Sequence, residues 1–223
     1  MNRSLIELPD EPRWVEAHGL ATEPATWRRA LGDGFVIGND DALLGVIAGR
    51  ADPAAVIALS REVTHATLLT ASDELAAALR ESGRHVDRAI LHTLPDPSSL
   101  PDLDGASLLP DDVPLDHVWG PLADELAYVR GRRPVWAAYV EGVPVSFAYA
   151  PWRSGHWFDV SIDTLPSARQ LGLATIVAAA LIRDERAHGR EPVWGADESN
   201  HASLRLAERL GFVPVDELWV AMP

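Results

Sequence analysis

Between residues 157 and 189 the sequence passes from a strand pattern to a turn and then to a helix pattern. Residues 157–164 alternate large apolar with polar side chains, which is the period of a half-buried strand. Pro166 ends that ladder because it has no N–H to donate. From Leu173 onward the apolar residues recur on one helical face, and Gly189 is a suitable helix stop. This order restricts the chain to folds in which a strand turns tightly into a helix.

The turn itself, residues 169–174, has the properties of an anion-binding site. Gly172 lets a ligand approach the backbone closely, and Ala174 is small enough for tight contact. The first turn of the following helix offers N–H groups without intrahelical partners and a partial positive charge. A pyrophosphate is the kind of ligand that binds in such a place. Taken alone, the pattern also fits an ordinary strand-turn-helix with one glycine.

A second helix signal follows a short strand pattern over residues 193–196. Asn200 is a typical N-cap residue, and Gly211 can take the left-handed position after the helix, with Phe212 packing back on it. The residues that fall on the buried side are Leu206, Ala207 and Leu210. Those that fall on the solvent side are Arg205, Glu208 and Arg209. Residues 213–222 then have a strand pattern.

The turn Arg-Gln-Leu-Gly-Leu-Ala at 169–174 and the Asn-x-x-Ser-x-x-Leu-Ala-x-x-Leu-Gly-Phe helix at 200–212 resemble the signature of the GNAT superfamily of acyl-CoA-dependent N-acyltransferases. The resemblance is good over residues 104–223 and weak to absent over the first hundred. It implies a mixed α/β fold (α+β) with a central, mostly antiparallel sheet, splayed strands and flanking helices. A smaller α/β half would precede this domain.

The resemblance also implies a site for acetyl-CoA as co-substrate, without a metal. A bound amine attacks the thioester directly, and an N–H freed where the strands splay stabilises the oxyanion. The expected acyl-CoA-binding residues are Ile162, Asp163, Thr164, Arg169, Gln170, Leu171, Gly172, Leu173, Ala174, Thr175, Asn200 and Ser203. Asn200 can serve as a plain N-cap at the same time.

An amine nucleophile needs a base, because a lysine-like amine with a pKa of about 10.4 is less than about 0.1% neutral at pH 7. A general base accelerates such a reaction by about 10² to 10⁴. Period two places Asp159 and Asp163 on one face of their strand. The wider set of candidates is His156, Asp159, Asp163, Asp197 and Glu198. We expect the catalytic residues among Asp159, Asp163 and Ser203, although each carboxylate can also be a simple surface group.

Two departures from the family pattern bear on activity. Many GNAT enzymes carry a tyrosine seven residues after this asparagine to protonate the leaving thiolate, and here that position is Ala207. Ser203, water or another group would replace it, or the thiolate would leave unprotonated. Gln170-Leu171 stands where Gly-Lys or Gly-Arg is common, which removes a cation near the phosphates. We therefore expect an N-acetyltransferase acting on a small-molecule or peptide amine, with a catalytically weak acyl-CoA-binding sensor or regulator as the alternative.

The first hundred residues predict a separate α/β unit. Residues 95–105 are rich in Pro, Ser and Asp and form the best linker candidate, so we expect domains at 1–100 and 104–223. Strand patterns over 42–48, 66–70 and 86–94 alternate with helix patterns over 53–63 and 73–81. This order resembles the second half of a GNAT fold without its binding turn. A degenerate GNAT-like half and an unrelated α/β cap both remain open.

Composition limits the kinds of ligand, partner and covalent chemistry that we expect of this protein. With 47% hydrophobic residues the chain can bury an ordinary core, and zero cysteines exclude disulfides and a cysteine acyl-enzyme. The net charge of −14 argues against nucleic acid, whose binding needs a basic face, and either attracts a cationic amine or only aids solubility. No apolar run is long enough to span a bilayer, and the N-terminal residues lack the apolar core of a signal peptide. We expect a soluble cytoplasmic protein, not bound to a membrane, as a monomer or homodimer.

Overall fold

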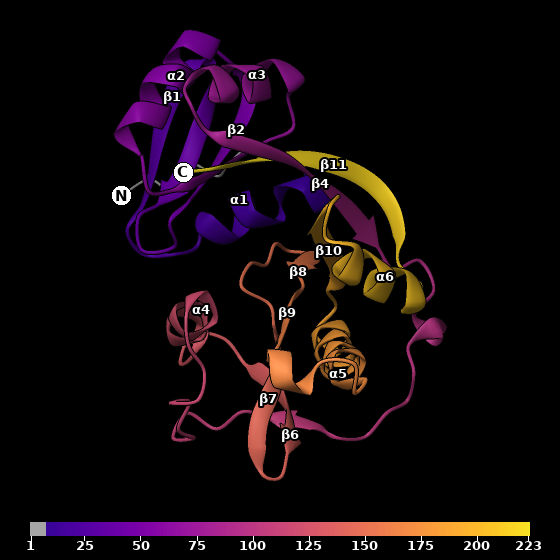
Figure 1. Ribbon diagram of the computed structural model, residues 1–223. Coiled ribbons are helices and arrows are strands. Elements are labelled where there is room, and N and C mark those ends of the chain that lie inside the picture. The colour runs from indigo at the N-terminus through magenta and orange to yellow at the C-terminus, as the bar shows by residue number, and fades with distance from the viewer. Residues whose placement is uncertain (1–7) are drawn as a thin grey trace.

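The computed structural model describes residues 8–223, which form two lobes joined by long strands (Figure 1). The elements up to residue 100 are η1 (Pro12–Trp14), α1 (Val15–Leu20), β1 (Thr26–Asn39), β2 (Leu44–Ala51), α2 (Pro53–Glu62), β3 (Thr67–Thr70), α3 (Asp73–Glu81), β4 (His85–Thr93) and η2 (Pro97–Ser99). The elements after it are β5 (Ala106–Leu108), α4 (Pro121–Val129), β6 (Val135–Val140), β7 (Val143–Tyr149), β8 (Trp157–Asp159), β9 (Ser161–Thr164), η3 (Pro166–Ala168), α5 (Leu173–Ala187), β10 (Glu191–Asp197), α6 (His201–Arg209) and β11 (Val213–Met222).

Most of the expected elements are present, with two differences. The sequence over 117–129 favours a helix, but the helix begins only at Pro121, because Gly120 has a φ of 68° and proline favours the first helical position. The long strand β1 and the short helix α1 were not predicted. Residues 28–34 of β1 are mostly exposed, so that part lacks the alternation that marks a half-buried strand.

The strands form a seven-stranded sheet in the order β1-β2-β3-β11-β4-β10-β8 and a four-stranded sheet in the order β5-β6-β7-β9. Among the described strands, only β2·β3 and β10·β8 are parallel pairs. The other pairs are antiparallel. This confirms the predicted mixed, mostly antiparallel sheet flanked by helices.

The two halves of the chain exchange their last strands. The unit β3-α3-β4 corresponds in order to β10-α6-β11, and β11 lies between β3 and β4. Likewise β4 lies between β11 and β10, so the central antiparallel pair β11·β4 takes one strand from each half. Figure 1 shows β11 arching from the lobe that carries α5 to the lobe that carries α2 and α3. The sheet therefore crosses the boundary that we predict near residue 100.

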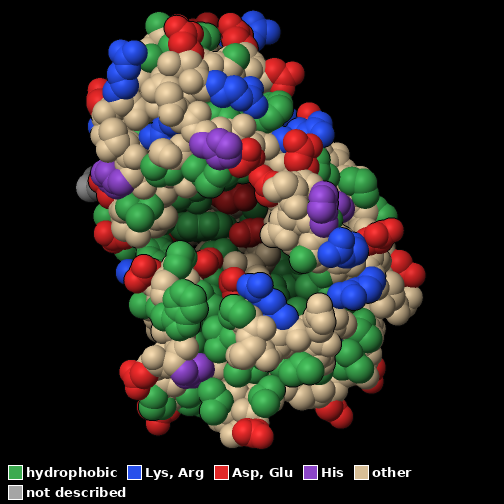
Figure 2. All heavy atoms as spheres, in the orientation of Figure 1, with side chains coloured by type: hydrophobic (Ala, Val, Ile, Leu, Met, Phe, Trp, Pro, Cys, Tyr) green, Lys and Arg blue, Asp and Glu red, His purple; other side chains and the backbone are tan. Residues whose placement is uncertain are grey.

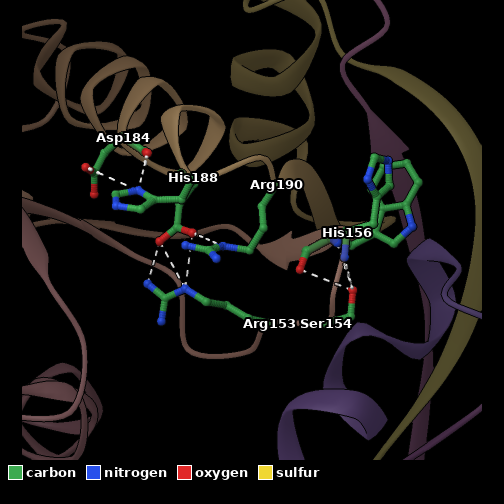
Figure 3. A network of polar contacts seen from close by, with 8 residues as sticks. Arg153, Ser154, His156, Asp184, His188 and Arg190 are labelled. Atoms are coloured by element: carbon green, nitrogen blue, oxygen red, sulfur yellow. Dashed lines mark hydrogen bonds and ion pairs between the residues drawn. The ribbon is translucent and has the colours of Figure 1, made fainter.

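The site elements are held by two kinds of contact. The apolar face of α5 packs on β6, β7 and β10, burying Val177, Leu181 and Ile182 completely. At its other end α5 contributes Glu185, which is 1% exposed and accepts hydrogen bonds from Arg153 Nη2 at 2.5 Å and Arg190 Nε at 2.5 Å. Figure 3 shows these arginines converging on one carboxylate. Because a buried charge needs partners, this network fixes the loop before β8 to α5.

Candidate functional site

Between β8 and β9, at Val160, the chain leaves the seven-stranded sheet and joins the four-stranded sheet. β8 pairs with β10 as far as Asp159 opposite Val193, and the Val160 N–H donates to the Val193 carbonyl at 2.9 Å. Beyond this point β9 pairs with β7, whereas β10 continues beside β4. The two strands therefore diverge, which confirms the predicted splay.

The edge of β9 that faces the gap carries unpaired backbone groups. The Leu165 N–H donates to Val145 of the neighbouring strand at 2.8 Å, so the odd-numbered residues 161 and 163 point their backbone groups to β7. Alternate residues of a strand point to opposite edges. The N–H groups of Ile162 and Thr164 therefore face the gap between β9 and β10.

The turn before α5 presents backbone donors. Gln170 has a φ of 65° and Gly172 a φ of 77°, and a Cβ on Gly172 would meet no described atom within 4 Å. The Arg169 N–H donates to Pro166, and the Thr175 N–H donates to Gly172 at 3.1 Å. Within residues 8–223, the N–H groups of residues 170–174 have no hydrogen-bond acceptor. The donors for an anion are thus concentrated on these five residues.

The start of α6 lies across the gap from this turn. The Asn200 side chain accepts from the Ser203 N–H at 3.1 Å, so the predicted N-cap is present. The Trp194 indole N–H donates to Ser203 Oγ at 2.9 Å. The Ser203 hydroxyl proton and the Asn200 Nδ2 group have no acceptor in the described part of the chain. Both are therefore available to a ligand.

These elements enclose a cavity of about 760 Å³. The predicted acyl-CoA-binding residues that line it are Ile162, Asp163, Thr164, Arg169, Gln170, Gly172, Leu173, Ala174, Thr175, Asn200 and Ser203. Leu171 does not line it and is 59% exposed. The geometry thus brings the predicted set together from β9, the turn and α6.

Two cations of the site were missed in the sequence. Arg205 and Arg209 are exposed, as predicted, but they also line the cavity, and neither forms an ion pair among the described residues. The signal that could have found them is their spacing of four residues from each other, on the same helical face as Ala202. With Arg169 they place three positive charges around the turn, which offsets the missing cation at Gln170-Leu171.

A second cavity, of about 310 Å³, lies on the face of the large sheet that α1 approaches. Along β10, Trp194 lines the larger cavity while Gly195 and Asp197 line the smaller one. Asp159, at the last residue of β8, also lines the smaller cavity. The point where the strands split therefore separates the two cavities. Figure 2 shows acidic and hydrophobic side chains together in a hollow between the lobes.

Two carboxyl groups of the smaller cavity have strongly raised pKa values. Burial, and next the charge of Glu125, raise the pKa of Asp159 to about 7. Burial, and next the charge of Asp159, raise the pKa of Glu16 to about 8. In contrast, hydrogen bonds from the Ser199 hydroxyl and N–H lower the pKa of Asp197. The cavity thus contains carboxyls suited to proton transfer and one that stays charged.

The remaining base candidates lie elsewhere. Asp163 lines the larger cavity and Asp159 the smaller one, so the prediction that they share one face is wrong, because the chain passes from one sheet to the other between β8 and β9. Burial, followed by the charge of Glu125, raises the pKa of Asp163. His156 is exposed and stacks edge-on against Trp157. Glu198 is bound to Arg88 at 2.6 Å on the exposed surface. Glu16 was not among the candidates, since it lies far from the motif in sequence and reaches the site only through α1.

The position where a tyrosine is common is closed to the site. Ala207 is fully buried and belongs to the core cluster that also contains Val177 and Leu181. A tyrosine of α6 therefore cannot donate a proton here, and Ser203 is the hydroxyl of this helix that lines the cavity. Among residues 8–223 no three His, Asp or Glu side chains are arranged to hold a metal ion. No described helix has the length and apolar character needed to cross a membrane.

Comparison with known proteins adds three findings. Residues 136–220 match the model of the GNAT acetyltransferase family. A search of curated proteins found no match. Solved structures match the fold over nearly the whole chain, at identities below 25%.

One similar structure is a GCN5-related N-acetyltransferase-like protein from Streptococcus suis, with 17% identity, a TM-score of 0.70, and coverage of 97% of this chain and 94% of that one. Another is a GCN5-related N-acetyltransferase from Kribbella flavida, with 18% identity, a TM-score of 0.61, and coverage of 95% and 94%. A tandem GNAT protein from the clavulanic acid biosynthesis pathway matches with 18% identity, a TM-score of 0.53, and coverage of 90% and 84%.

Proposed function

This chain belongs to the GNAT superfamily through residues 136–220, and on that premise we propose that it is an N-acetyltransferase. It transfers the acetyl group of acetyl-CoA to a primary amine of a small molecule or peptide. The observation that carries the proposal is the split between β9 and β10. It lies between a cavity lined with backbone donors and arginines and a cavity lined with carboxylates.

The larger cavity fits acetyl-CoA by its donor set. The five free N–H groups of residues 170–174 suit a pyrophosphate, because they point out of a helix start where the helix dipole is positive. Arg169, Arg205 and Arg209 supply positive charge around them. The Asn200 amide can donate to the amide carbonyls of the pantetheine arm. The absence of a Cβ on Gly172 keeps the cradle open.

The residues at the split would carry the chemistry. Acetyl-CoA supplies the acyl group as a thioester. The Ile162 N–H donates to the thioester oxygen and stabilises the negative charge that develops on it. Asp159 accepts the proton of the ammonium, and the freed amine forms a bond to the acyl carbon while the carbon–sulfur bond breaks. The thiolate leaves and takes a proton from the Ser203 hydroxyl. The second proton that the nitrogen loses on becoming an amide passes through water to the Ser203 oxygen, so that the hydroxyl is restored.

The N-terminal half is proposed to be a degenerate GNAT-like domain over residues 1–100, packed against the active domain over 104–223. Two observations support this. The exchange of β4 and β11 makes the strand order alike from both ends of the sheet, and the fold is similar to that of a tandem GNAT protein. The turn equivalent to 169–174 is replaced by Gly49-Arg50-Ala51-Asp52-Pro53 between β2 and α2. This half contributes Glu16 to the smaller cavity.

Calorimetric titration with acetyl-CoA tests the cofactor site on the wild type, Gly172→Trp and Gly189→Trp. Both glycines have nearly the same left-handed φ, 77° and 79°, both have open space around their Cβ position, and they flank the same helix. Only Gly172 lines the cavity. We expect micromolar binding that Gly172→Trp abolishes and Gly189→Trp retains. Equal loss in both variants would assign the effect to backbone strain and contradict the proposed site.

Thiol release in the presence of acetyl-CoA and a panel of primary amines tests the reaction. The chain has no cysteine, so a thiol reagent reports the released CoA alone. The chain also has no lysine, so its own side chains cannot act as acceptors. The lack of a tyrosine on α6 favours the alternative of a weak acyl-CoA-binding sensor. Binding without turnover on any amine would establish that alternative.

A further inference from the structure

The carboxylates of the smaller cavity lie in two groups, one at each end of the cavity. Asp159 lies opposite Val193 in the β8·β10 pair, and Asp197 lies four residues further along β10. At a rise of about 3.3 Å per residue, these positions are about 13 Å apart along the sheet. Glu16 belongs to the Asp159 end, since the charge of Asp159 acts on it. Asp87 belongs to the other end, two residues beyond the partner of Asp197 on β4.

The floor between the two ends is apolar. Leu91 lies opposite Gly195, midway between the levels of Asp159 and Asp197. Leu69 and Leu218 line the same cavity from β3 and β11. A ligand that spans the cavity therefore meets acidic groups at its termini and hydrocarbon in its middle.

The carboxylates at the Asp159 end have no cationic partner among the described residues, whereas His85 lies beside the other end. No arginine lines the smaller cavity within residues 8–223, and neither Glu16 nor Asp159 forms an ion pair there. Glu16 Oε2 is buried and has no hydrogen-bond partner among the described residues. Asp87 contacts His85 at 3.0 Å. Since the described carboxylates do not converge into a metal site, a single divalent ion does not fit them.

We propose that the acceptor is a diammonium compound, with two cationic amines joined by a flexible hydrocarbon chain. One amine binds at Asp159 and Glu16, beside the split, and receives the acetyl group. The other stays charged and binds at Asp197 and Asp87. Because the carboxylate side chains reach into the cavity, the two nitrogens lie roughly 8 to 12 Å apart on the strand spacing. This inference rests on the proposed function, since it names the substrate class of the same site.

The test compares α,ω-diaminoalkanes, from diaminobutane to diaminododecane, with monoaminoalkanes of the same length. The ratio of kcat/KM for diamine over monoamine is measured by CoA release. A hydrogen bond to a charged group contributes about 1.5 to 3 kcal/mol, so we expect a ratio of about ten or more at the best length. A ratio near one at every length, with turnover present, would overturn the diammonium inference and leave the proposed function standing.

Asp197→Asn and Glu198→Gln form a matched pair for this ratio. The asparagine keeps the acceptor for the Ser199 N–H, so the turn is preserved while the charge is lost. Glu198 is adjacent but pairs with Arg88 on the surface. We expect the ratio to fall towards one in Asp197→Asn and to persist in Glu198→Gln.

Calorimetric titration of the diamines with CoA present separates the two proposals. Tighter binding of diamines than of monoamines without any turnover would uphold the diammonium site and contradict the proposed reaction. Equal binding of both would contradict the diammonium site.

Discussion

Replacing Glu16 with glutamine removes an ionisable group from the smaller cavity and should stabilise the protein at alkaline pH. The Glu16 pKa is raised from its usual 4.5 to about 8 by burial and then by the charge of Asp159. Below pH 4.5 the carboxyl is protonated in both the folded and the unfolded chain, so the substitution changes little. As the pH rises towards 8, only the unfolded chain ionises, and the wild type loses stability relative to the variant.

The size of this effect follows from the shift. A pKa unit corresponds to about 1.4 kcal/mol, so the shift of Glu16 sets an upper limit of about 5 kcal/mol. Because the side chain is only half-buried and borders a cavity, we expect about 2 kcal/mol. Urea unfolding of the wild type and of Glu16→Gln at pH 5 and pH 9 measures it.

The control is Glu11→Gln, which removes an exposed carboxylate from the residue before η1. We expect its effect on the free energy of unfolding to stay within about 0.5 kcal/mol at both pH values. If Glu16→Gln gave the same difference from the wild type at pH 5 and pH 9, Glu16 would be ionised normally in the folded protein. The reasoning on the buried carboxyls of this cavity would then be wrong.

Further predictions concern the reaction, the cofactor site and the fold. The wild-type kcat/KM should rise with pH through about 7 as Asp159 ionises, and Asp159→Asn should lower kcat/KM by about 10² to 10⁴. Glu125→Gln should shift the midpoint of the pH profile downward, because it removes a charge that raises the Asp159 pKa. The double variant Arg205→Ala/Arg209→Ala should weaken CoA binding about tenfold in low salt and less in high salt, measured by calorimetry, whereas Arg61→Ala on the remote helix α2 should not. Gly211→Ala should cost about 1 to 3 kcal/mol in urea unfolding, because Gly211 has a φ of 90° and a Cβ would collide with Ser99; Gly83→Ala, at a φ of 95° in open space, isolates the backbone part of that cost.

The sequence alone determined the elements of the proposed acyl-CoA site, because their signals are local. The end of β9, the turn and the start of α5 each depend on nearby residues, namely Pro166, Gly172 and the apolar face of α5. Asn200 likewise caps the helix that it precedes. The hairpin β6-β7 and the helix end at Gly211 were predictable for the same reason. Each depends on residues within a few positions of one another, which is the range over which backbone sterics and capping hydrogen bonds operate.

Only the tertiary structure decided which groups meet at the split. Glu16 and Asp159 are far apart in sequence and come together because α1 packs against β8. The strand exchange that places β11 between β3 and β4 depends on long-range pairing that periodicity does not encode. The raised pKa values of Asp159 and Glu16 arise from burial and from the charged neighbours of each group. Both causes exist only in the folded protein. The sequence therefore determined the turn and the helix start at which we propose that acetyl-CoA binds, whereas the packing of the two halves determined the charge and shape of the cavity on the other side of the split.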